Sequence, residues 1–115
     1  MAIISKDLLS ASTHGDLIKI VQTATAGTLI HTATAETDDI DEVWVWACNT
    51  NTSTVTLTIE FSSAAVDDNI KVNINPNETV LVIPGIPLRN GLTVKGFATV
   101  ANKVNCFGFI NKIVI

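Results

Sequence analysis

The stretch EVWVWACNTNTSTVTLTIEF, residues 42–61, decides the fold. Its second half, TVTLTIEF, alternates between polar and apolar residues, which is typical of a strand with one buried and one wet face. Its first half does not alternate. In VWVWAC (residues 43–48) two valines and an alanine would lie on one side of a strand, and two tryptophans and a cysteine on the other. The stretch therefore predicts a strand whose second apolar side needs cover.

Two further segments are apolar on both sides, ETVLVI (residues 78–83) and KVNCFGFINKIVI (residues 103–115). Large exposed apolar patches on monomers usually mark an interface, so we expect a neighbouring subunit to cover the second face. Cover by the protein's own N-terminal arm, or by sheet twist and long loops, is the alternative. The residues predicted to form the interface are Trp44, Trp46, Val80, Val82, Phe107 and Phe109.

About eight strand patterns follow one another, separated by turn signals such as Pro76-Asn77 and Asn90-Gly91, and no segment has a convincing helical pattern. The PGIP run at residues 84–87 cannot be a central strand, because proline has no backbone N–H for the ladder. The predicted fold class is all-β, an antiparallel β-sandwich of jelly-roll or Ig-like type. Periodicity does not reveal strand order, so both topologies stay open.

The chain of 115 residues suits one domain. Residues 1–16 are irregular and are interpreted as an N-terminal arm or entry strand. Residues 17–115 are interpreted as the single sandwich domain.

Charged residues make up 16% of the chain and the net charge is −4. The seven lysines and arginines are scattered singly, which argues against nucleic-acid binding. The first ten residues do not resemble a signal peptide, and no apolar run approaches the ~20 residues that cross a bilayer. We therefore expect synthesis in a cytoplasm and no membrane partner. Cys48 and Cys106 are interpreted as free thiols in strands, with a disulfide between them as the alternative.

The sequence has no recognisable catalytic constellation, and we expect neither enzymatic activity nor a cofactor. His14 and His31 stand alone, and nucleotide-binding and nucleophile motifs are absent. One acidic loop is a weak candidate for calcium, since packed carboxylates can supply the oxygens that calcium prefers. Its residues are Asp38, Asp39, Asp41 and Glu42. The tryptophans could stack on a sugar, but their valine neighbours favour packing.

Three runs resemble small all-β virion proteins of tailed bacteriophages, and the resemblance extends over roughly residues 40–113. They are WVWACNTNTSTVTLTIEF, INPNETVLVIPGIPLRNGLTVKGFA and NKVNCFGFI. In that group a strand ends in an x-N-T turn before an alternating Thr/Val strand, and a V-x-I-x-P-x-E-T hairpin and a closing strand follow.

The resemblance implies a non-catalytic protein that binds and stabilises a phage capsid as a decoration, or cement, protein. It implies a homotrimer on the capsid exterior, in contact with the major capsid protein and assembled in the host bacterial cytoplasm. A ligand-binding or receptor-binding module of a tail or fibre is the alternative.

Overall fold

The computed structural model describes residues 2–63, 65 and 69–115. Within them the protein is all-β, and nine strands form two antiparallel sheets packed as a β-sandwich, which confirms the predicted fold class. Sheet A contains β1 (Ile3–Leu8), β2 (Ile18–Lys19), β4 (Ile40–Asn49), β7 (Thr79–Leu88) and β9 (Val104–Val114). Sheet B contains β3 (Thr28–Thr32), β5 (Val55–Phe61), β6 (Asn69–Ile74) and β8 (Thr93–Ala98).

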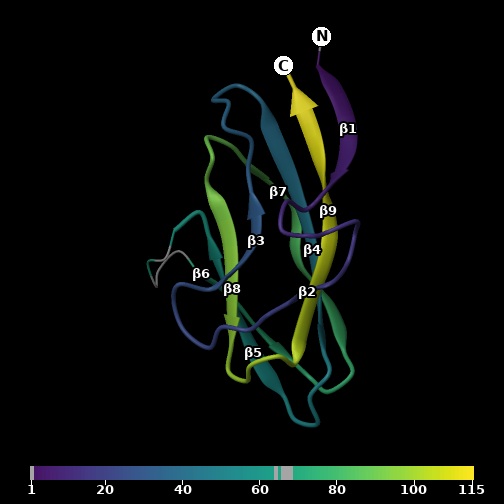
Figure 1. Cartoon of the computed structure of the whole chain (residues 1–115), viewed down its shortest axis with the longest axis vertical. Helices are drawn as coiled ribbons and strands as arrows, with labels where there is room; N and C mark the ends of the chain where they lie inside the picture. The colour runs from purple at the N-terminus through teal and green to yellow at the C-terminus, as the bar shows by residue number, and fades with distance from the viewer. Residues whose placement is uncertain (1, 64, 66–68) are drawn as a thin grey trace.

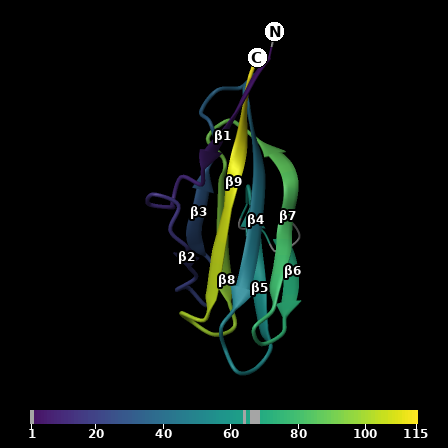
Figure 2. The same ribbon diagram turned by 90° about the vertical axis from the view of Figure 1, so that its right-hand side faces the viewer.

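The strand order is that of a jelly roll rather than an Ig fold. Sheet A runs β1-β9-β4-β7, with β2 also paired to β9, and sheet B runs β3-β8-β5-β6. The pairs β5–β6, β4–β7, β3–β8 and β2–β9 nest inside one another along the chain, and successive pairs alternate between the sheets. The chain is thus one long hairpin, folded at β5–β6 and rolled into two layers (Figures 1 and 2).

The buried layer follows the alternation of the sequence. Val43, Val45 and Ala47 on β4 have no exposed surface, because they face the other sheet. The alternating residues of β5 and β9 join them in one cluster. The members from these two strands are Val55, Leu57, Ile59, Val104, Cys106 and Ile110.

The expectation that the second face of the TVTLTIEF strand is wet is wrong at two positions. Thr58 and Glu60 on β5 are buried. Residues 25–27 cover Glu60, which accepts hydrogen bonds from the Thr25 hydroxyl (2.5 Å) and the Gly27 N–H (2.6 Å). The carboxylate thus has two partners, which offset the cost of burying it.

The predicted N-terminal arm contains a strand. β1 pairs antiparallel with the end of β9 over six residues, from Ile3–Val114 to Leu8–Phe109. All six β1 side chains are exposed, whereas the next residue, Leu9, is 1% exposed and belongs to the core. The N-terminus therefore lies beside the C-terminus at one end of the molecule (Figure 1).

β7 continues through the PGIP run instead of ending before it. Pro84 and Pro87 are tolerated because β7 is the edge strand of sheet A and, among the described strands, pairs only with β4. The register between β4 and β7 shifts twice, between Val43 and Trp44 and between Val45 and Trp46. These irregularities change which β7 residues face outward.

Candidate binding surface on sheet A

The second apolar side of β4 forms the outer face of sheet A. Trp44 lies opposite Phe109 on β9, and Trp46 lies opposite Phe107. Outward-facing residues of the neighbouring strands extend this surface: β1 adds a residue beside Phe109, and β7 adds one beside each tryptophan. We call the following set the aromatic face: Leu8, Trp44, Trp46, Leu81, Pro84, Phe107 and Phe109.

The four aromatic rings pack against one another. Ring centroids are 6.3 Å apart for Trp44 and Trp46, 6.1 Å for Trp44 and Phe109, and 6.2 Å for Trp46 and Phe107. The planes of these pairs lie within 21° of parallel, as in offset stacks. Lys6 on β1 places its Nζ 4.4 Å from the centroid of Phe109, a cation–π contact. The rings therefore cover one another in part and remain half-buried.

A glycine on β7 leaves room for the Trp44 ring. Gly85 has φ +73, and a Cβ there would lie 2.6 Å from Cζ2 of the Trp44 ring. The indole therefore lies against the bare backbone of the edge strand. Leu81 and Pro84 remain exposed at this border of the aromatic face.

A polar row adjoins the rings. Glu42 accepts hydrogen bonds from the Trp44 indole N–H (2.7 Å) and the Asn111 side-chain amide (3.0 Å). These bonds, with that of Asn111 the stronger influence, lower the pKa of Glu42 below its ordinary value. The carboxylate is thus held ionised beside the apolar rings and fixes the orientation of Trp44.

The outer face of sheet B has a different character. The Thr56 hydroxyl on β5 donates to the Asn73 side-chain oxygen on β6 (2.7 Å), and Thr54, just before β5, donates to that of Asn75, just after β6 (3.2 Å). Lys71 is exposed on the same strand pair, as its alternating position predicts. The molecule therefore has one wet broad face and one apolar broad face.

The six residues predicted for the interface divide into two groups. Trp44, Trp46, Phe107 and Phe109 lie on the aromatic face. Val80 and Val82 do not: Val82 is buried in the core, and Val80 packs against it opposite Ala47. Leu81, opposite Trp46 and 44% exposed, is the residue of this run that faces outward. The sequence pattern was apolar at all three positions and did not distinguish them.

The acidic candidate residues do not converge. Asp41 faces the interior and Glu42 the outer face, because they are consecutive on β4. Asp39 accepts a hydrogen bond from the Ile115 N–H, and Asp38 is exposed. Among residues 2–63, 65 and 69–115, no three His, Cys, Asp or Glu side chains are grouped to hold a metal ion. The geometry thus argues against a calcium site at this loop.

The two cysteines are free and lie on opposite sides of sheet A. Cys106 lies opposite Ala47 in the interior, whereas Cys48 shares the outer side with Trp46. Burial raises the pKa of the Cys106 thiol to about 12, so it stays protonated and unreactive. The disulfide alternative is therefore not realised.

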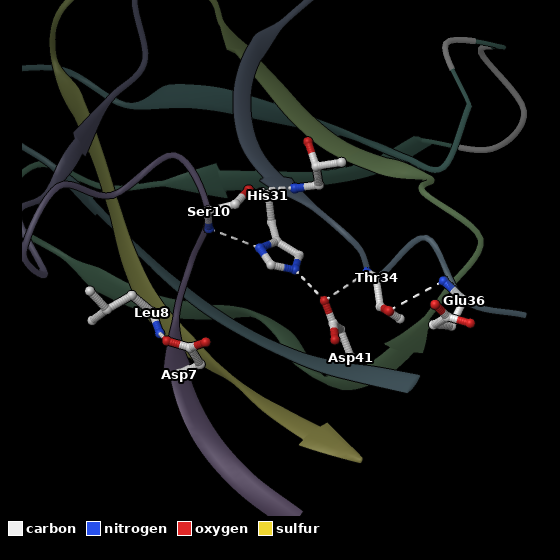
Figure 3. Close-up of polar contacts among 8 residues, drawn as sticks. Asp7, Leu8, Ser10, His31, Thr34, Glu36 and Asp41 are labelled. Atoms are coloured by element: carbon white, nitrogen blue, oxygen red, sulfur yellow. Dashed lines mark hydrogen bonds and ion pairs between the residues drawn. The ribbon is translucent and has the colours of Figure 1, made fainter. Parts of the chain in front are cut away.

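A buried polar pair that sequence reasoning missed links the two sheets. His31 on β3 places Nε2 2.8 Å from Oδ2 of Asp41 on β4, and both side chains are 3% exposed. The His31 Nδ1 accepts a hydrogen bond from the Ser10 N–H (2.9 Å), as Figure 3 shows. Because Nδ1 is an acceptor, the proton is on Nε2 and is donated to Asp41. No spacing motif announces this pair, since its partners are on strands of different sheets.

This pair does not form a catalytic triad. Both ring nitrogens of His31 are engaged, and the Ser10 hydroxyl accepts a hydrogen bond from the Thr32 N–H instead of contacting the imidazole. A cavity of about 320 Å³ adjoins the pair, with Asp7 and Lys112 on its wall. These hydrogen bonds connect Ser10, which follows β1, to β3 of sheet B. They leave neither nitrogen of His31 available for proton transfer.

Comparison with known proteins gives no relative: no family model, curated protein or solved structure matches the chain. Over the described ranges, the structure contains no helix with the length and hydropathy to cross a membrane.

Proposed function

We propose that this chain is a non-catalytic structural protein that works by binding other protein surfaces through the aromatic face. One observation carries the proposal: four stacked aromatic rings, flanked by exposed Leu8 and Leu81, lie on the outside of one sheet. The opposite broad face is built from threonine and asparagine. Aromatic residues are enriched where specific interfaces bury most of their binding energy.

The proposal extends to the biological setting that the sequence resemblance implies. On this view the protein decorates and stabilises the capsid of a tailed bacteriophage, and its partners are copies of itself and the major capsid protein. The jelly-roll fold occurs in viral capsid domains but also in lectins, so the fold alone does not select this role. A homotrimer is the copy number that the resemblance implies, and the mass in solution by light scattering tests it.

A charge placed on the aromatic face tests whether this face binds. We expect Leu81→Lys to weaken association at least about tenfold, because an ammonium would be buried without a partner. Association is measured by sedimentation for self-assembly and by capsid co-sedimentation for particle binding. Leu92→Lys is the matched control, since Leu92 is 41% exposed and Leu81 44%, and Leu92 lies outside the aromatic face. Equal effects of the two substitutions would contradict the proposal.

A tail or fibre module that binds a small ligand is the second candidate, and the polar Glu42 and Asn111 beside Trp44 favour it. A sugar platform needs aromatic rings with polar neighbours, and this border supplies them. The rings, however, already stack on one another, and Glu42 is already bonded to both neighbours.

Iodide quenching of fluorescence separates these two functions, because Trp44 and Trp46 are the two tryptophans of the chain. We expect the assembled protein to be quenched at least about twofold less than the dispersed protein, since a protein interface shields both indoles from iodide. Undiminished quenching after assembly would favour the ligand platform.

A further inference from the structure

Sheet A has two edges with unequal protection against pairing with another chain. The β7 edge carries Pro84, Pro87, a positive-φ Gly85 and two register shifts. Prolines and bulges are the devices by which proteins block edge-to-edge contact. β1 at the other edge keeps an uninterrupted register of six residues and contains no proline or glycine. Within the described part of the chain, no strand other than β9 pairs with β1.

The side chains of β1 also leave most of this edge open to pairing with another strand. Lys6 is the charge that would usually repel a second strand, but its Nζ lies over the Phe109 ring within its own sheet. Asp7 accepts a hydrogen bond from the N–H of the next residue, Leu8, at 2.8 Å, so it occupies one backbone donor, at the Leu8 end of the strand only. Ile3 and Ile4, on opposite faces of the strand, are 65% and 66% exposed. The edge therefore offers open backbone groups flanked by uncovered apolar side chains on both faces.

We propose that β1 is a docking edge for a second copy of this chain, joined antiparallel through β1 of each copy into one continuous sheet. A two-fold axis normal to the sheet relates such strands, so one residue must lie opposite its own copy. Centring on Lys6 or Asp7 places like charges opposite each other, which is unfavourable. Centring on Ile4 or Ser5 avoids this, and an Ile4 centre also pairs two β-branched side chains. The second copy is thus the partner that this edge fits.

This contact goes beyond the proposed function, because it uses backbone groups of the edge and not the rings of the aromatic face. The two-fold axis leaves both aromatic faces on the same side of the joined sheet. One joined pair would then present two binding faces to one partner surface, which raises avidity without any new contact. Closed assemblies formed through the aromatic face could still be linked pairwise through β1.

Cysteine cross-linking tests the edge contact directly. Four variants, Ile4→Cys, Ser5→Cys, Lys6→Cys and Asp7→Cys, are made in a Cys48→Ser background and oxidised at equal protein concentration. Folding is not at risk, because all β1 side chains are exposed, and Cys106 is buried. We expect the fraction of disulfide-linked dimer at position 4 or 5 to exceed that at positions 6 and 7 at least about fivefold, since only the central pair lies within disulfide reach.

Uniform cross-linking at all four positions, or none at any, would overturn the edge contact. Deletion of residues 1–5 removes Ile4 and Ser5 but keeps Lys6 and Leu8 beside Phe109, and it should abolish the edge-joined dimer that sedimentation detects at high concentration. Leu81→Lys should leave the cross-link at position 4 or 5 intact, because Leu81 lies on β7, at the far border of sheet A. Loss of capsid binding with the cross-link preserved would therefore be a result about the aromatic face alone, and the reverse pattern a result about the edge alone.

Discussion

Gly108→Ala is expected to destabilise the protein by about 4 kcal/mol or more, which is enough to unfold many domains of this size. Gly108 lies opposite Val45 at the centre of the β4–β9 pair. A Cβ at this position would be 1.9 Å from the backbone oxygen of Trp44 and 3.1 Å from the Cα of Val45. Backbone atoms cannot move aside as a flexible side chain does, so β4 and β9 would have to separate. Urea denaturation monitored by tryptophan fluorescence measures the loss.

Gly91→Ala is the matched control for this prediction. Gly91 has φ +67, but a Cβ added there would meet no atom within 4 Å, so only the backbone conformation penalises the substitution. That penalty is about 1–2 kcal/mol. Equal losses for Gly108→Ala and Gly91→Ala would mean that the close approach of β4 and β9 does not limit the fold.

The second large effect concerns the stability of the protein after deletion of N-terminal residues. Deletion of residues 1–8 is expected to cost about 1 kcal/mol or less, because β1 buries no side chain. Deletion of residues 1–12 is expected to cost about 3 kcal/mol or more, because it also removes Leu9, and truncating a buried leucine costs about 2–5 kcal/mol. It also removes the Ser10 N–H, whose hydrogen bond His31 accepts. Denaturation midpoints of the two truncations give the comparison.

Leu9→Ala in the full-length chain separates the contribution of the buried Leu9 side chain from that of the other residues in 1–12. If burial of Leu9 is the cause, this single substitution should reproduce most of the loss of stability seen on deleting residues 1–12. If the protein without residues 1–12 is as stable as the full-length chain, the contacts of residues 9–12 with sheet B do not stabilise the fold. Tests of the arm in particle binding therefore need deletions that end before Leu8, which keep both the buried Leu9 and the aromatic face.

The periodicity of the sequence was sufficient to predict the fold class and which residues of a regular strand share a face. On β4 the alternation correctly separated buried from outward positions, as Val45 and Trp46 illustrate. Such patterns succeed where one strand runs without a bulge, because side chains then alternate strictly between faces. On β7 the alternation gave no such guide, because Val80, Leu81 and Val82 are all apolar, and the two valines were assigned to the wrong side.

Other features depended on contacts distant in sequence. The His31–Asp41 pair forms only because the packing of the two sheets brings β3 of one sheet against β4 of the other. The burial of Glu60 depends on residues 25–27 folding over β5. β1 was not recognisable as a regular strand, because IISKDL has no alternation, and the structure explains this by the exposure of both its faces. Polar partners and edge strands are thus the parts that periodicity does not encode.

The nested strand pairs have a consequence for the order in which the chain can fold. Among the described strands of the nest, β5 and β6 alone are paired and consecutive along the chain, and every further pair closes a longer loop. Loop-closure entropy rises with that length, so the hairpin of β5 and β6 is the natural nucleus and growth proceeds outward from it. β4, apolar on both sides, must wait for its neighbour β9, which the ribosome makes last among the strands. During synthesis its tryptophans therefore lack the Phe107 and Phe109 rings that pack against them, and apolar surface exposed in this way makes a nascent chain prone to misassociation.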